Sequence, residues 1–125
     1  MNKFIREANS YFCKTKAIAK NTSETTDSLE VGGVYSALEV IIDVTTKIQI
    51  TSTKTLSITL QESADNTDFS DRVTIYSATS PDDINAAEGW LRFTLPADIK
   101  KYARLKVTTN DGSAAGAITA YLHLV

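Results

Sequence analysis

Along most of the chain, apolar and polar residues alternate in short runs. Leu38, Val40, Ile42 and Val44, for example, are separated by single residues. Because successive side chains of a strand point to opposite faces, this period of two predicts strands with one face in a core and the other in water. Turn-forming residues separate these runs, and the same alternation recurs at 56–60, 73–75, 91–95, 105–107 and 118–124.

The number of these runs predicts an all-β fold. About eight strands with almost no helix, in a chain of 125 residues, are typical of two packed antiparallel sheets. The eight-stranded form of that architecture is the jelly roll, so we predict a jelly-roll-like antiparallel two-sheet sandwich. Asn-Asp-Gly at 110–112 favours a tight antiparallel hairpin between the last two strands. One short helix is expected at 80–89, where Ser80 can cap the first turn, Pro81 suits the first helical position and Gly89 can end it.

The first 28 residues follow a different pattern from the rest. Residues 21–28, NTSETTDS, contain no apolar side chain. Before them, Phe4, Ile5, Tyr11 and Phe12 lie at roughly helical spacing. An apolar anchor followed by a polar strap is therefore indicated.

This contrast predicts two parts, an N-terminal arm at 1–28 and a jelly-roll β-sandwich domain at 29–125. Large apolar side chains on a polar strap gain free energy when another chain buries them. We therefore expect the apolar end of the arm to contact a neighbouring subunit or another partner, and the sandwich to fold without it.

Composition narrows the classes of function. The net charge is -2 at pH 7, which gives no electrostatic reason to expect nucleic acid as a partner. No stretch approaches the ~18 consecutive apolar residues of a membrane-spanning helix, so no membrane partner is expected. The single cysteine, Cys13, rules out an internal disulfide, and we expect it to be a half-buried apolar side chain.

Three aspartates spaced three apart, Asp65, Asp68 and Asp71, are the strongest candidates for a metal site. A helix-loop-helix calcium site needs oxygen ligands at alternate positions, a glycine and a late glutamate. Here Thr67 and Phe69 occupy the alternate positions. We therefore predict a bend between two strands, in which polar side chains bond to the backbone and Phe69 turns inward. The alternative is a cation held adventitiously by the carboxylates; no metal site and no cofactor are expected.

No catalytic set is recognisable in the sequence. His123, the only histidine, alternates with Leu122 and Leu124 and is expected to point out of the last strand. The pair Gly32-Gly33 lacks both the lysine of a phosphate-binding loop and the spaced glycines of a dinucleotide site. We therefore predict that the protein is not an enzyme and has no catalytic residues.

A basic cluster occurs at Lys100, Lys101, Arg104 and Lys106, with Tyr102 among them. Nucleic-acid binding would need such residues on one face, with aromatic rings for the bases to stack on. Apolar residues alternate with the later members of the cluster, so a strand with one buried face explains the pattern as well. We interpret the cluster as the solvated face of a strand. The alternative with a function is contact with another protein chain, through Lys100, Lys101, Tyr102 and Arg104.

Several segments taken together resemble one family of small virion proteins. In chain order they are SLEVGG at 28–33, TLSITLQES at 55–63 with an acidic loop ending on Phe69, GWLRFTLP at 89–96, KKYARLKV at 100–107 and SAAGAITAYL at 113–122. From about Phe12 to the C-terminus, the chain is similar to the phage capsid cement proteins of the Bbp16-like family. The charged segment KTKAIAKNTSETTD at 14–27 departs from the family pattern.

The resemblance implies a jelly-roll fold and a homotrimer on the outer surface of the capsid, where cement proteins tie neighbouring major capsid subunits together. It implies a structural, non-enzymatic role, with a second copy of the chain and the major capsid protein as partners. The location it implies is the virion, after assembly in the host cytoplasm.

One alternative of a different class is a carbohydrate-binding β-sandwich module of a phage particle. Such modules also combine a strand, a polar loop and an aromatic side chain. Trp90 or Tyr76 could stack on a sugar ring in that case.

Overall fold

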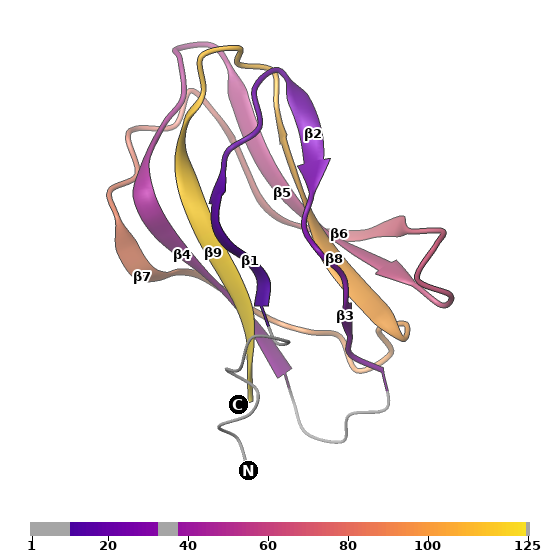
Figure 1. Cartoon of the computed structure of the whole chain (residues 1–125). Coiled ribbons are helices and arrows are strands. Elements are labelled where there is room, and N and C mark those ends of the chain that lie inside the picture. Colours follow the sequence, from indigo (N-terminus) through magenta and orange to yellow (C-terminus); the bar gives the residue numbers. More distant parts are fainter. Residues whose placement is uncertain (1–10, 33–37, 125) are drawn as a thin grey trace.

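Nine strands make up the part of the chain that the computed structural model describes, residues 11–32 and 38–124 (Figure 1). That part contains no helix. In chain order the strands are β1 (Tyr11–Ala17), β2 (Thr22–Thr25), β3 (Leu29–Glu30), β4 (Leu38–Gln49), β5 (Thr55–Ser63), β6 (Ser70–Thr79), β7 (Ala87–Thr94), β8 (Tyr102–Thr109) and β9 (Ala115–Leu124).

The strands form two antiparallel sheets. Sheet A has the order β1-β9-β4-β7, and sheet B has the order β2-β8-β5-β6 with β3 also paired to β8. Since β2 and β3 follow each other along β8, they act as one interrupted strand, which leaves four strands in each sheet. The chain changes sheets repeatedly, and β5 and β6 form the one pair of successive full strands that share a sheet. This is the jelly-roll arrangement that the alternating pattern predicted.

The core lies between the two sheets and consists of the alternating apolar residues. Val40 and Ile42 of β4 face Ile58 and Leu60 of β5 across the sandwich, and each of the four is at most 1% exposed. Burying one such side chain contributes on the order of 1.5–3 kcal/mol. The period of two in the sequence therefore identified the core-facing side of these strands correctly.

The prediction of a separate N-terminal arm at 1–28 is wrong for residues 11–28. β1 pairs with β9, and Phe12 is fully buried in the core. The polar residues behind it form β2, which is exposed along its length and pairs with β8 through its backbone. Backbone hydrogen bonds rather than apolar side chains hold an edge strand in place, so the polar sequence of β2 gave no sign of a strand. Residues 11–28 therefore belong to the sandwich, while Phe4 and Ile5 lie outside the described residues.

The predicted hairpin at 110–112 is also wrong, because β8 and β9 belong to different sheets and do not pair. The segment crosses the end of the sandwich instead. Asp111 is 2% exposed, and its carboxylate accepts hydrogen bonds from Thr51 N at 2.7 Å and Ser113 N at 2.8 Å. These bonds hold the crossing segment against the β4–β5 loop. Turn-forming residues signal a change of direction, but they do not say which sheet the chain enters next.

No helix forms at 80–89, where one was expected. Ser80 has a positive φ of 51°, and its Oγ accepts a hydrogen bond from Thr53 N instead of capping a helix. Ile84 then forms a β-bridge with Ile48, and β7 begins at Ala87. Contacts with the neighbouring strands thus override the local helix signals. Across the described residues, no helix has the length and apolar character that crossing a membrane requires.

Candidate interaction surfaces

The outer face of sheet B carries the basic cluster that the sequence indicated. β8 buries alternate residues in the core and leaves Tyr102, Arg104 and Lys106 half-exposed on the outside. The guanidinium carbon of Arg104 lies 3.9 Å from the centroid of the Phe69 ring, and Arg104 Nε donates to Gln61 Oε1 at 2.8 Å. Phe69 therefore supports Arg104 from outside the core and does not turn inward as predicted.

This arrangement continues into the neighbouring strand β6. Gln61 Nε2 donates to Asp71 Oδ1 at 2.8 Å, and the Lys106 ammonium lies 4.0 Å from the same oxygen. Asp71 thereby offsets part of the positive charge on this face. Arg104 and Lys106 thus belong to a cross-strand polar network, as the solvated-face interpretation requires.

Lys100 and Lys101 differ from the two basic residues that follow them. Both are exposed, and among the described residues no carboxylate lies within ion-pair distance of either ammonium group. Their backbone is fixed, since Lys100 N donates to Glu62 Oε1 at 3.2 Å and the Lys101 carbonyl accepts from Val31 N at 2.7 Å. The Lys101 ammonium lies 5.6 Å from the centroid of the Tyr102 ring. The segment therefore presents two unpaired positive charges from a rigid base.

The aspartate loop at 64–69 is a hydrogen-bonded turn. Asp65 Oδ1 accepts from Thr67 N at 2.9 Å, Asp68 N at 3.0 Å and the Ser63 hydroxyl at 2.9 Å. The Asp68 backbone N–H, followed by that of Thr67 and the Ser63 hydroxyl, lowers the pKa of Asp65 to about 2. The predicted turn is thus confirmed. Within the described chain, no group of three or more acidic, histidine or cysteine side chains is arranged to hold a metal ion.

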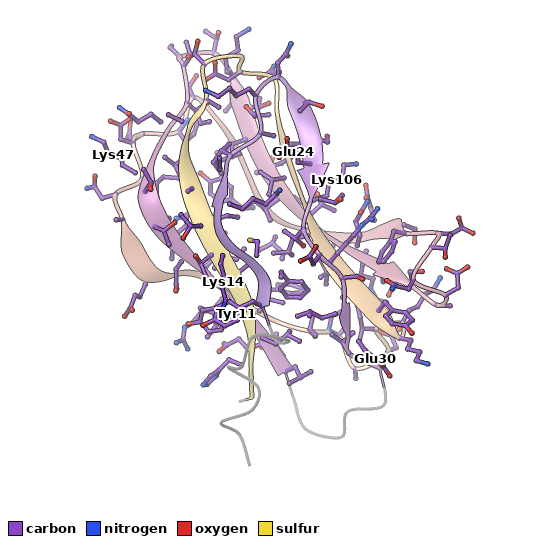
Figure 2. The ribbon with its side chains drawn as sticks, viewed as in Figure 1. Tyr11, Lys14, Glu24, Glu30, Lys47 and Lys106 are labelled. Atoms are coloured by element: carbon purple, nitrogen blue, oxygen red, sulfur yellow. The ribbon has the colours of Figure 1, made fainter. Side chains whose placement is uncertain are left out.

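The outer face of sheet A brings together aromatic residues of β1 and β9. The Tyr11 and Tyr121 rings lie 5.4 Å apart between centroids, and the Lys14 ammonium lies 4.6 Å from the Tyr11 ring. Tyr11 and Lys14 lie beside each other on β1 (Figure 2). Tyr11 and Phe12, predicted as parts of one contact, thus fall on opposite faces of the sheet, and the burial of Phe12 excludes it from an external contact.

Three charged or titratable side chains form a row farther along the same face. The Glu39 carboxylate of β4 lies 3.3 Å from the Arg92 guanidinium of β7 and 3.8 Å from His123 Nδ1 of β9. His123 is half-buried and lies on the outer face, as predicted from its alternation. The row links three strands across the sheet and has the composition of a surface ion-pair cluster.

The two long sides of the sandwich differ. Where β1 and β2 meet, Asp27 N donates to the Phe12 carbonyl at 3.1 Å and the Lys16 ammonium lies 3.5 Å from the Glu24 carboxylate. Cys13 is half-buried at this side, as expected, and its burial raises the pKa of the thiol. Backbone and charge contacts therefore link β1 to the β2 segment, beside a hollow of about 290 Å³ lined in part by Cys13 and Asp27.

The opposite side, between β6 and β7, is lined by large apolar residues that are only partly buried. The Tyr76 and Trp90 rings meet edge to face across it, with centroids 4.9 Å apart. The sequence suggested these two rings for sugar stacking and gave no sign that they meet, since the pairing of distant strands cannot be inferred from periodicity. The partly buried apolar residues of this side are Val73, Ile75, Tyr76, Ile84, Trp90, Leu91 and Phe93.

The fold is a jelly roll, and the polar side chains described above either form hydrogen bonds within its loops or lie on the outer faces of its sheets. Comparison with protein families makes the assignment more specific: the family model Bbp16 matches residues 11–122. The chain therefore belongs to the Bbp16 family. No curated protein matches the sequence.

Solved structures include one similar chain from the structure of the infectious bursal disease virus Gt strain. It has a TM-score of 0.45 and 11% sequence identity, and the similarity covers 92% of this chain and 32% of that one. The present chain thus spans about a third of the length of that neighbour.

Proposed function

We propose that this chain is a non-enzymatic structural protein of a phage virion. In this role it is a capsid cement, or decoration, protein that binds the outer capsid surface and stabilises contacts between major capsid subunits. The observation that carries the proposal is the Bbp16 family match over residues 11–122, which spans both sheets. The cement role itself comes from the resemblance described in the sequence analysis.

The proposal includes partners and a location. The chain forms a homotrimer and binds the major capsid protein. It is located on the capsid surface of the virion, which is assembled in the host cytoplasm. Neither nucleic acid nor a membrane is among its partners. A net charge of -2 supports the absence of nucleic acid from this set.

A non-enzymatic role is supported by what the most buried or most perturbed carboxylates do. Asp65 accepts three hydrogen bonds within its own loop, and Asp111 fixes the segment that crosses the end of the sandwich. Glu62 is 8% exposed and holds both Lys100 N and the Arg72 guanidinium. Each carboxylate therefore has a structural task.

Lys100 and Lys101, just before β8, are the proposed contact residues at the end of sheet B. Their charges are exposed and unpaired within the described chain, on a backbone anchored by Glu62 and Val31. Tyr102 and Arg104 adjoin them. Such a cluster suits acidic side chains of a capsid subunit at the rim of an interface.

Carbohydrate binding has no comparable support. Sugar stacking needs a flat aromatic face open to solvent, whereas Tyr76 and Trp90 meet edge to face and each is only partly exposed. We therefore do not propose this function.

The test is to add the purified protein to phage heads that lack it. Bound protein should co-sediment with the heads and raise the temperature at which they break open. An unrelated jelly-roll protein added at the same concentration is the control. Failure to co-sediment, or binding that leaves the disruption temperature unchanged, would contradict the cement role.

A further inference from the structure

We propose that the β6–β7 side of the sandwich, around Tyr76, Ile84 and Trp90, is a docking surface for a basic, apolar segment of another protein. The inference rests on the proposed function for the identity of that partner, the major capsid protein. It deepens the proposed function by naming a second face of the chain, apart from Lys100 and Lys101, that contacts this partner.

The first observation is the asymmetry between the two long sides. Phe12 on the β1–β2 side is fully buried, and a backbone hydrogen bond and an ion pair cross above it. Both sides are bounded by end strands, β1 and β2 on one and β6 and β7 on the other, so the difference lies in their side chains. On the β6–β7 side, Tyr76, Ile84 and Trp90 remain partly exposed. Apolar residues gathered on one side indicate a surface that another molecule covers.

The second observation is the charge at the rim of this side. Asp82 lies two residues before Ile84 and Glu88 lies two residues before Trp90, and both are exposed. Among the described residues, no lysine or arginine nitrogen lies within ion-pair distance of either carboxylate. The surface therefore carries two uncompensated negative charges beside its apolar centre.

The third observation is a hollow at the end of this side, with a volume of about 570 Å³. The β4–β5 loop and the segment that joins β6 to β7 form its walls. Asp83, on the wall, already bonds to Gln49 and lies 3.7 Å from the Lys47 ammonium, whereas Asp82 has no such cation. The residues that line the hollow are Ile50, Ser52, Ser80, Pro81, Asp82 and Asp83.

These features define the chemistry of the partner. An aliphatic or aromatic side chain of the partner would pack against Tyr76 and Trp90. Aromatic residues are enriched at the centres of protein interfaces, where they contribute most of the binding energy. A lysine or arginine beside it would approach Glu88 or Asp82, and opposite charges at the rim would fix the register of the contact. An acidic segment of the same apolar content would be repelled.

The experiment compares two charge reversals that each change the net charge equally. Glu88→Lys alters the docking surface, whereas Asp27→Lys alters an exposed aspartate on the opposite, β1–β2 side that also has no described ion pair. Affinity for phage heads lacking the protein should fall about tenfold or more for Glu88→Lys and less than about twofold for Asp27→Lys. Equal affinity of the two variants would overturn the docking surface and leave the cement role standing.

A second measurement does not depend on the heads. Trp90 is the only tryptophan of the chain, so its fluorescence reports on this surface directly. A synthetic peptide of alternating leucine and lysine should shift the emission in a saturable way, and a peptide with glutamate in place of lysine should not. If wild-type protein failed to bind heads, the proposed function would fail, and this titration alone would decide the docking surface.

Two further outcomes would overturn the inference. Identical shifts with both peptides would show that charge plays no part. A Glu88→Lys variant that binds heads normally but loses self-association would assign this side to contacts between copies of the chain.

Discussion

Gly116 lies where β9 passes closest to β4. Its φ is 120°, a conformation that side-chain-bearing residues rarely adopt. A Cβ at this position would lie 2.6 Å from Ile48 Cα and 2.8 Å from the Lys47 carbonyl oxygen. The pairing of β4 with β9 therefore depends on the absence of a side chain here.

We predict that Gly116→Ala lowers the free energy of unfolding by about 2 kcal/mol or more, from strain in φ and the clash with backbone atoms. Gly112→Ala is the matched control, because no atom lies within 4 Å of the Cβ it would add. It should change stability by less than about 0.5 kcal/mol. Urea denaturation of both variants measures the difference, and equal stabilities would contradict the close approach of β4 and β9.

The pKa of Asp65 gives a prediction about acid stability. The folded-state pKa is about 2, below the ordinary value of 3.8, because backbone N–H groups and Ser63 bond to the ionised carboxylate. This contribution to stability is fully present above about pH 4 and is lost as the pH falls through about 2.

Asp65→Asn should therefore weaken the dependence of the melting temperature on pH between about 4 and 2. Asn keeps one acceptor oxygen, so the turn should survive. Asp82→Asn removes one charge from a residue with no described ion pair and serves as the control. An unchanged pH dependence in Asp65→Asn would contradict the bonding assigned to this turn.

Among the elements, β1 is an edge strand whose two faces lie in different environments, the core and the outer surface of sheet A. Phe12 faces the core and Tyr11, its neighbour, lies on the outer face beside Tyr121. The strand therefore completes sheet A and contributes Phe12 to the core at the same time.

We predict that Phe12→Ala lowers the free energy of unfolding by about 3–5 kcal/mol, as expected for removing a fully buried aromatic side chain. Tyr11→Ala should cost only about 1 kcal/mol, because it removes a partly exposed cross-strand contact. Chemical denaturation followed by tryptophan fluorescence measures both. Were Phe12→Ala as stable as wild type, residues 11–17 would behave as the independent arm that the sequence first indicated.

Sequence patterns identified the elements that bury one face and missed those that do not. The strands β4, β5 and β8 alternate, and the core confirms their inward-facing residues. β2 has no apolar residue, so only its backbone pairing with β8 reveals it. The crossing at 110–112 and the meeting of Tyr76 with Trp90 depend on which sheet each strand joins, and local periodicity carries no such information.

For the whole molecule, the two long sides of the sandwich differ in their side chains, and the β6–β7 side is the more apolar one. The exposed Lys100 and Lys101 lie just before β8 of sheet B, and Asp82 and Glu88, which have no described ion pair, lie in sequence beside residues of the apolar side. A protein with several distinct surface patches can contact more than one neighbour at once, which a cement role requires.

We predict that the isolated protein sediments as a trimer at tens of micromolar concentration, as the family resemblance implies. Analytical ultracentrifugation provides the measurement, and a single monomeric species across that range would contradict the trimer.

Cryo-electron microscopy of the parent particle tests whether this chain is a capsid cement protein. We expect density for this jelly roll on the outer capsid surface, with each copy touching more than one major capsid subunit and trimers at threefold positions. A particle whose outer surface lacks this density, or whose copies each touch a single capsid subunit, would contradict the claim.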